Sequence, residues 1–210
     1  MRELLAIDGL AETTTDAFRR RLIEVADSVG LEPSYLAGVI RFESSYKADI
    51  RNPLSGATGL IQFLPSTART LGTTVDELAL MTAEEQLGWV GKYYERVLAG
   101  RRITSVQDHY LAVFAGSIGA SPGQVLFASP IKAYAQNKAL DTSGDGTITA
   151  AEATAPVERL VEKARARPVI LVDMAAAPAT PAPALTQDDG AALAVGLFGA
   201  LVLGARRLAS

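Results

Sequence analysis

Apolar residues in the first half of this chain recur at helical spacing, and this pattern constrains the fold more than any other feature. Phe18, Leu22, Val25 and Val29 lie three or four positions apart, and Gly30 follows as a typical helix end. Segments later in the chain repeat the pattern, and no alternation of helices with apolar strands indicates a parallel sheet. We therefore expect a mainly α protein with a minimal β element.

Start signals support the same interpretation. Thr74 with Glu77, and Thr82 with Glu85, have the spacing of a capping box, in which each side chain bonds the other residue's backbone N–H. Each pair predicts the first turn of a helix. Residues 51–63 are instead rich in Gly, Pro, Ser and Thr, and we expect an irregular, hairpin-like segment there.

The composition changes sharply towards the C-terminus and divides the chain into three parts. Residues 1–167 have the composition of a folded domain. Residues 168–187 contain an Ala/Pro-rich stretch that is typical of an extended linker. Residues 188–207 contain an uninterrupted apolar and glycine run, which predicts a hydrophobic helix.

This hydrophobic helix has two interpretations. Residues 190–205 would span about 24 Å as a helix, whereas a bilayer core of about 30 Å usually needs about 20 residues. Arg206 and Arg207 follow the run and can extend its reach to the headgroups. We expect a C-terminal membrane anchor, and a helix buried against protein is the alternative.

Charge and residue usage exclude several functions. The chain has 210 residues, 20 basic and 23 acidic, for a formal net charge of −3, whereas a dedicated nucleic-acid-binding protein shows a basic excess. Cysteine is absent, which excludes disulfides, thiolate metal sites and a cysteine nucleophile. With His109 the single histidine, a Ser-His-Asp triad would have to be built around it.

One carboxyl group stands out because it falls on an apolar helix face. Glu43 is seven residues after Leu36, nearly two turns, so it shares the stripe that also carries Val39. Partial burial raises the pKa of a carboxyl group, as a general acid at neutral pH requires. The alternative is a glutamate that reaches solvent or pairs with Arg41 or Lys47.

The sequence around Glu43 carries several ordered motifs. Glu43-Ser44 is followed by Gly-Ala-Thr-Gly-Leu-Ile-Gln at 56–62 and by Pro-Ser-Thr-Ala at 65–68. Together these motifs strongly resemble the soluble lytic transglycosylase (SLT) domain of the lysozyme-like superfamily. The resemblance continues more weakly to about residue 165, and the segments at 110–116 and 134–137 are similar to the phage-type and goose-lysozyme-like branches.

The resemblance implies a fold, a reaction and a set of site residues. Such enzymes cleave the bond between N-acetylmuramic acid and N-acetylglucosamine in peptidoglycan, release a 1,6-anhydro product and need no cofactor. Glu43 matches the glutamate that makes both proton transfers, and Gln62 and Ser44 match substrate-binding positions. The family's tyrosine is absent from 113–116, and Tyr110, one turn earlier, is a candidate replacement or simply a core residue.

Two other functions stay open. Asp49 is the nearest second carboxylate, and if it lay across the cleft it could activate water and make the protein a muramidase. Otherwise Asp49 is a loop residue near Arg51. A non-catalytic wall-binding or virion structural protein with the same fold is the alternative from a different class.

Residues 141–152 match the ligand pattern of an EF-hand loop. Oxygen ligands at positions 1, 3, 5, 7 and 12 would come from five residues: Asp141, Ser143, Asp145, Thr147 and Glu152. We expect a solitary structural Ca²⁺ site, because Pro156 would interrupt or kink the exit helix. A connecting loop in which Thr149 and Glu152 form only a capping box is the alternative.

The location follows from the two chain ends together. The opening residues lack the apolar stretch of a secretory signal, which a cellular wall enzyme normally carries. A phage particle delivers its own wall enzyme, so we expect a membrane-anchored virion protein of a membrane-containing phage. Its partners would be peptidoglycan strands, the membrane and other virion proteins. A bacterial cell envelope is the alternative location.

Overall fold

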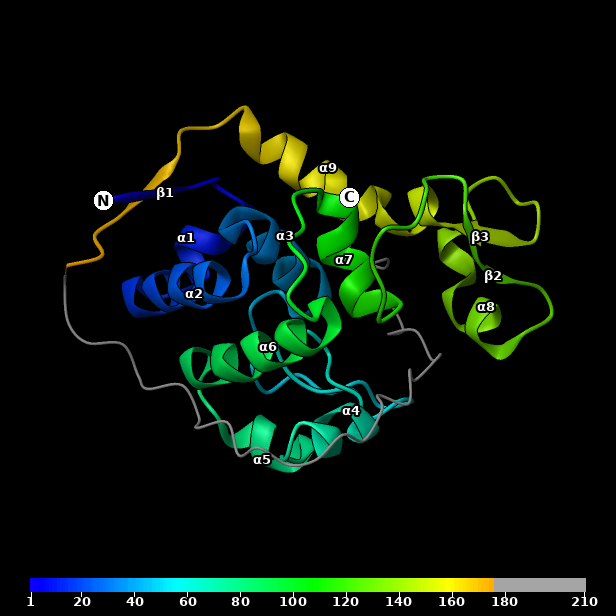
Figure 1. The fold of residues 1–210 in the computed structure, drawn as a ribbon, viewed down its shortest axis with the longest axis horizontal. Coiled ribbons are helices and arrows are strands. Elements are labelled where there is room, and N and C mark those ends of the chain that lie inside the picture. The colour runs from blue at the N-terminus through cyan, green and yellow to red at the C-terminus, as the bar shows by residue number, and fades with distance from the viewer. Residues whose placement is uncertain (176–210) are drawn as a thin grey trace.

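The computed structural model describes residues 1–175, and these form a mainly helical fold (Figure 1). The longer helices are α2 (Asp16–Val29), α3 (Pro33–Ser44), α6 (Ala83–Leu98), α7 (Val106–Phe114) and α9 (Ala150–Arg165). The short helices are α1 (Leu10–Thr13), α4 (Pro65–Thr70), α5 (Val75–Leu80), α8 (Lys132–Asn137) and the 3₁₀ turn η1 (Lys138–Leu140). The expected mainly α class is confirmed.

Local sequence signals set the helix ends. The side chain of Thr15 accepts a hydrogen bond from the backbone N–H of Phe18 at the start of α2, and Gly30 ends this helix with φ 77°. Both capping boxes expected at the starts of α5 and α6 are formed. Helix α9 continues through Pro156, so of the two effects expected there, an interruption or a kink, the interruption is wrong. Its first turn is secured by a capping box of Thr149 and Glu152.

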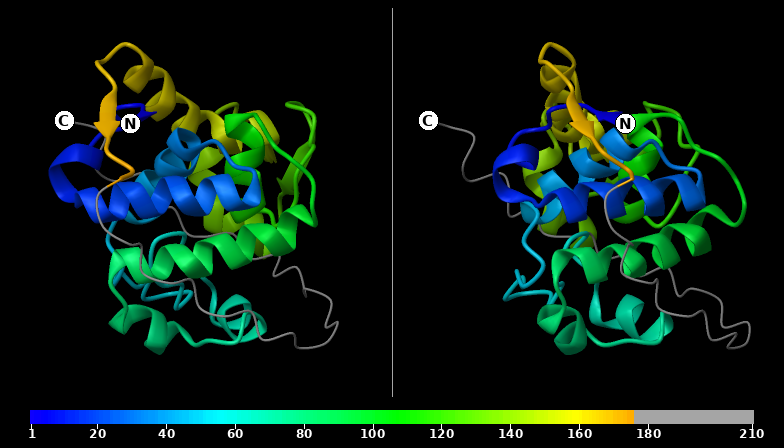
Figure 2. Two further views of the ribbon diagram at one scale, coloured as in Figure 1. Left: turned by 60° about the vertical axis from the view of Figure 1, so that its left-hand side comes forward. Right: turned by 90° about the vertical axis from the view of Figure 1, so that its left-hand side faces the viewer.

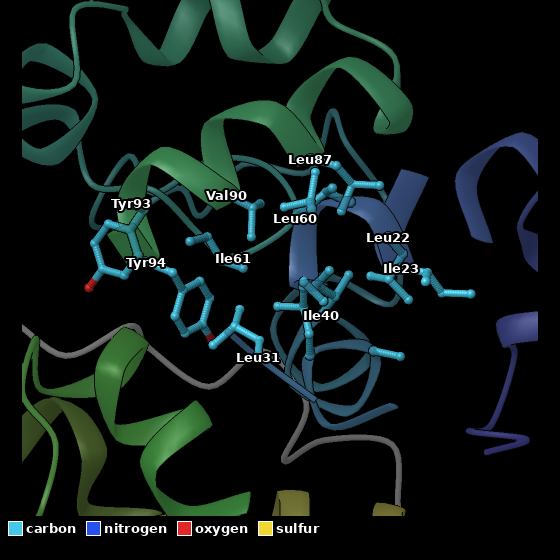
Figure 3. Close-up of a cluster of buried hydrophobic side chains, with 14 of the residues drawn as sticks. Leu22, Ile23, Leu31, Ile40, Leu60, Ile61, Leu87, Val90, Tyr93 and Tyr94 are labelled. Atoms are coloured by element: carbon cyan, nitrogen blue, oxygen red, sulfur yellow. The ribbon is translucent and has the colours of Figure 1, made fainter. Parts of the chain in front are cut away.

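The main core lies where α2, α3 and α6 meet. Figure 3 shows Leu22 and Ile23 from α2, Ile40 from α3 and Leu87 and Val90 from α6 pointing into one cluster. Helices α2 and α6 lie along each other (Figure 2), and Gly91 lets them approach closely. A Cβ atom at Gly91 would lie 3.0 Å from Cγ1 of Val25.

A second apolar cluster joins the C-terminal part of the domain to α3. It contains Val39 of α3, Tyr110 and Phe114 of α7, and Val157 of α9, all buried. Helix α3 therefore lies between the two clusters, with α7 and α9 packed on its other side (Figure 1). This central position buries most of α3 and, with it, the residues near its C-terminal end.

Two short antiparallel pairs complete the fold. β1 (Arg2–Leu4) pairs with β4 (Ile170–Val172), so the two ends of the described chain lie side by side (Figure 1). β2 (Val125–Ala128) pairs with β3 (Thr147–Thr149) beside α8. The folded part thus extends beyond the expected boundary at residue 167. Composition did not reveal this extension, because β4 depends on a partner strand more than 160 residues away.

Among residues 1–175, no helix is long and apolar enough to cross a membrane. The predicted hydrophobic helix at 188–207, and most of the predicted linker at 168–187, lie outside the described residues.

Candidate active site

Glu43 lies in the last turn of α3 and is buried, with 6% of its surface exposed. The side chain of Glu32 caps the start of this helix, and Pro33 follows in its first turn. Gly38, one turn and a residue before Glu43, allows close packing against α9, because a Cβ there would lie 3.1 Å from Cγ2 of Val161. The predicted position of Glu43 on a buried helix face is therefore what the fold produces.

Burial makes the carboxyl group of Glu43 an unusually weak acid. The pKa of its carboxyl group is raised from 4.5 to about 8, and the cause is desolvation by the surrounding protein. The Oε1 atom is buried without a hydrogen-bond partner among the described residues. At neutral pH the carboxyl group is therefore mostly protonated and has an oxygen free to interact with a ligand.

Gln62 lies in the loop that follows α3, in a tight hairpin between Thr58 and Phe63. The backbone of Thr58 and that of Phe63 exchange two hydrogen bonds, of 3.0 and 2.9 Å. Gln62 itself has a φ of 54° and is 5% exposed. Its Nε2 donates to the carbonyls of Gly59 (3.0 Å) and Ile50 (3.3 Å), whereas its buried Oε1 has no partner among the described residues.

Gln86, in the first half of α6, holds this hairpin in place through hydrogen bonds. Its buried side chain accepts a hydrogen bond from the backbone N–H of Leu60 (2.9 Å). Its Nε2 donates to the carbonyls of Ala48 and Leu78, both at 2.6 Å. Sequence reasoning missed Gln86, and the only available signal was a polar residue on the otherwise apolar face of α6.

Three tyrosines lie near the Glu43 carboxyl: Tyr93, Tyr94 and Tyr110. Burial is the main cause that raises their pKa values, and the charge of Glu43 raises them further. The hydroxyl of Tyr93 donates to the backbone carbonyl of Ala112 (2.6 Å), and that of Tyr94 donates to the backbone carbonyl of His109 (2.7 Å). Figure 3 shows both residues on the same part of α6. These two hydroxyl groups are therefore committed to the backbone of α7.

Tyr110 differs from the other two tyrosines. Its ring is fully buried between Phe42, with ring centroids 5.4 Å apart in a T-shaped contact, and Phe114, stacked at 5.4 Å. Its hydroxyl group has no hydrogen-bond partner among the described residues. Tyr110 is thus packed as a core residue, and it also has a free hydroxyl near Glu43. Both interpretations of this residue stay open.

Ser44 and Asp49 are placed less favourably for chemistry. The buried hydroxyl of Ser44 donates to the carbonyl of Ile40 (3.1 Å), so only its acceptor capacity is left for a ligand. Asp49 is exposed on the surface of the loop after α3. Glu43 has no other carboxylate among the described residues as a cause of its pKa shift.

His109 does not form a catalytic triad. Its Nε2 accepts a hydrogen bond from the backbone N–H of Glu32 (2.9 Å), so the proton is on Nδ1, which lies 2.7 Å from the carbonyl of Ser105. Burial lowers the pKa of this imidazole. Both ring nitrogens are therefore used to join the start of α3 to α7.

The EF-hand-like loop forms internal hydrogen bonds. Asp141 accepts from the backbone N–H groups of Gly144 (2.6 Å) and Gly146 (3.0 Å), and Asp145 accepts from that of Thr147 (2.8 Å). Residues 1–175 contain no group of three or more His, Cys, Asp or Glu side chains that could hold a metal ion. Asp141, Asp145 and Glu152, the three carboxylates among the expected ligands, therefore do not form such a group in this arrangement.

Glu152, the expected bidentate ligand, is used as a helix cap. Its carboxylate accepts from Thr149 on one side and from Thr142 and Ser143 on the other. The backbone N–H of Thr149 and these other donors lower the pKa of Glu152 to about 2. The capping box named as the alternative is thus formed, and calcium binding stays a prediction from the sequence.

Glu43 is thus a buried acidic residue at the end of the central helix of a mainly helical domain. Residues 21–90 match the family model of the transglycosylase SLT domain. This segment is therefore similar to the SLT domain, a family that cleaves peptidoglycan by lytic transglycosylation. It includes Glu43, Ser44 and Gln62, whereas Tyr110 lies outside it. A comparison with curated proteins finds no match.

Proposed function

We propose that this protein is a lytic transglycosylase that cleaves the β-1,4 bond between N-acetylmuramic acid and N-acetylglucosamine, with Glu43 as acid and base. The observation that carries the proposal is the buried Glu43 carboxyl, with a pKa raised to about 8, inside the matched SLT segment. A general acid is most effective when its pKa is near the working pH.

The proposed reaction uses one carboxyl group twice. Protonated Glu43 donates its proton to the glycosidic oxygen, and the bond from that oxygen to C1 of the muramic acid breaks. The resulting carboxylate then takes the proton of the muramic acid 6-hydroxyl, whose oxygen bonds to C1. The product carries a 1,6-anhydro ring, no water is consumed, and Glu43 ends protonated as it began.

Gln62 and Tyr110 supply the proposed polar contacts to the sugar. The Oε1 atom of Gln62 and the hydroxyl of Tyr110 are both buried without partners among the described residues. A buried polar group without a partner is costly, and a ligand that completes its hydrogen bonds removes that cost. The acetamido N–H and the hydroxyl groups of the glycan have the required donors.

The chemistry of the products tests this proposal. We expect the purified protein to release muropeptides that are lighter by one water than hydrolysis products, read by mass spectrometry of a peptidoglycan digest. Reducing-end products would instead indicate a muramidase, with Asp49 as the candidate second carboxylate. Intact peptidoglycan after prolonged digestion would favour the non-catalytic wall-binding or virion role.

A membrane-anchored location, in a phage virion or a bacterial envelope, is the second part of the proposal. It is supported by the apolar sequence at 190–205 and the two arginines that follow it. We expect the full chain to float with liposomes in a density gradient, and a chain ending at residue 185 to stay in the soluble fraction with its activity retained. Full-length protein that stays with the soluble fraction would contradict the anchor.

A further inference from the structure

The two residues that follow Glu43-Ser44 have an uncommon backbone conformation. Ser45 and Tyr46 have φ angles of 53° and 65°, in the left-handed region that favours glycine. A bulky side chain at such a position is costly and persists only where its surroundings fix it. The chain therefore leaves α3 through a turn that neighbouring side chains must stabilise.

Packing around Tyr46 supplies this support. The side chain is buried, with 6% exposed, and its ring makes a T-shaped contact with Phe18 of α2, with centroids 6.0 Å apart. Gly9 also lies next to this ring, because a Cβ there would be 3.8 Å from the ring atom Cε2. The ring of Tyr46 therefore contacts both α2 and the N-terminal segment.

The N-terminal segment, residues 2–13, is itself tied to the end of the domain. Asp8 accepts hydrogen bonds from Lys163 (3.1 Å) and Arg167 (2.5 Å). Partial burial opposes ionisation of Asp8, but these two cations outweigh it and lower its pKa. β1 also pairs with β4. The N-terminal segment, which lies outside the SLT match, is therefore fixed next to Tyr46.

The ring of Tyr46, rather than its hydroxyl, makes these contacts. The hydroxyl oxygen is buried without a hydrogen-bond partner among the described residues. Arg41, on the same helix as Glu43, faces Tyr46 together with Asp8 and Glu12 from the N-terminal segment, and burial dominates the rise in the pKa of the phenol. A phenylalanine could therefore fill the same space.

We propose that Tyr46 is a positioning residue for Glu43, and that residues 2–13 brace it from behind. The backbone N–H of Ser45 donates to the carbonyl of Arg41 (3.1 Å), which closes the last turn of α3 around Glu43. If the ring is lost, the left-handed turn can relax and this last turn can open. The carboxyl then moves and becomes hydrated. Small displacements of a reacting group reduce the rate strongly.

This inference rests on the proposed function for its activity readout, so the test also uses a readout that needs no substrate. The experiment compares Tyr46→Ala, Tyr46→Leu and Tyr46→Phe with the natural chain. We expect kcat on peptidoglycan to fall roughly 100-fold in Tyr46→Ala and roughly 10-fold in Tyr46→Leu, with KM changed less than threefold. Tyr46→Phe should retain kcat within about twofold, because the hydroxyl has no hydrogen-bond partner among residues 1–175.

The independent readout is the pKa of Glu43, measured by NMR titration of its carboxyl carbon. We expect this pKa near 8 in the natural chain and in Tyr46→Phe, and closer to the ordinary 4.5 in Tyr46→Ala and Tyr46→Leu. The nearest titratable groups, Tyr93, Tyr94 and Tyr110, stay neutral over this range because burial raises their pKa values.

Val97→Ala is the matched control, since Val97 is buried in the same core at the last turn of α6. It should lower stability and leave the pKa of Glu43 unchanged. An unshifted pKa of Glu43 in both Tyr46→Ala and Tyr46→Leu would overturn the positioning role. If the pKa shifts as expected but the natural chain does not cleave peptidoglycan, the proposed function fails and the positioning role stands.

Discussion

Replacing Glu43 by glutamine is expected to abolish peptidoglycan cleavage. Glutamine has nearly the same shape and fits the same buried position, but it cannot donate or accept the proton that the reaction transfers. Removal of a general acid-base group typically costs about 100- to 10,000-fold in rate. Since one carboxyl group makes both transfers in the proposed mechanism, we expect a loss at the upper end, measured as release of soluble muropeptides.

The same substitution should make the protein more stable at neutral pH. The pKa of Glu43 is about 8 in the folded chain and about 4.5 when exposed, so the unfolded state loses its proton first as the pH rises. Below pH 4.5 both states are protonated and burial of the ionised form has no cost. As the pH rises through 4.5 the folded state becomes progressively less stable, until Glu43 ionises near pH 8.

The size of this effect follows from the separation of the two pKa values. At pH 7 the unfolded pKa of 4.5 lies about 2.5 units below the working pH. Each unit is worth about 1.4 kcal/mol, so the cost removed by glutamine is about 3 kcal/mol. For a chain of this size we expect the Tm of Glu43→Gln to exceed that of the natural chain by roughly 5–10 °C at pH 7.

Two comparisons make this result specific to Glu43. At pH 4 the two proteins should melt at nearly the same temperature, because Glu43 is neutral in both the folded and the unfolded state. Glu158→Gln, on the exposed side of α9, should change neither activity nor Tm at either pH. Two results would contradict the assignment of Glu43 as the buried acid-base group. One is a Glu43→Gln protein that still cleaves peptidoglycan, and the other is a Glu43→Gln protein that is no more stable than the natural chain at pH 7.

The sequence predicted those parts of the fold that depend on neighbouring residues. Helical spacing and the capping boxes of Thr74 and Thr82 located helix starts correctly, because each signal is contained within one turn of helix. β4 was missed because its partner strand lies at the opposite end of the chain. The continuation of α9 through Pro156 was also missed, since packing of the helix on α3 and α7 overrides the local cost of proline.

The candidate site divides in the same way. The seven-residue spacing from Leu36 predicted that Glu43 lies on a buried helix face, and Glu43 is buried in the structure. Gln86 could not be predicted, because its role depends on carbonyl groups of Ala48 and Leu78 that come together only in three dimensions. For the same reason, the contact between Gly9 and Tyr46 is invisible in the sequence.

Gly59→Ala is expected to be strongly destabilising, because Gly59 lies against the side chain of Gln86, which holds the hairpin that contains Gln62. Its φ is +83°, which costs any other residue about 1 kcal/mol, and a Cβ there would lie 2.3 Å from Oε1 of Gln86. Gln86 would have to move and would leave buried polar groups without partners, at about 1–3 kcal/mol. We expect a total loss of about 2–4 kcal/mol in the free energy of unfolding, measured by denaturant titration.

The control is a second glycine with the same backbone conformation and free space around it. Gly72 has a φ of +86°, and a Cβ there would meet nothing within 4 Å, so Gly72→Ala should cost only the backbone part, about 1 kcal/mol. Adding Gln86→Ala removes the atoms that the new methyl group would meet. In that background Gly59→Ala should cost no more than Gly72→Ala, a coupling that a double-mutant cycle measures directly.

Equal losses for the two glycine substitutions in the natural background would show that Gln86 does not hold this loop. Gly59→Ala should also reduce peptidoglycan cleavage more than Gly72→Ala does, because the Gln62 side chain is held by the carbonyl of Gly59.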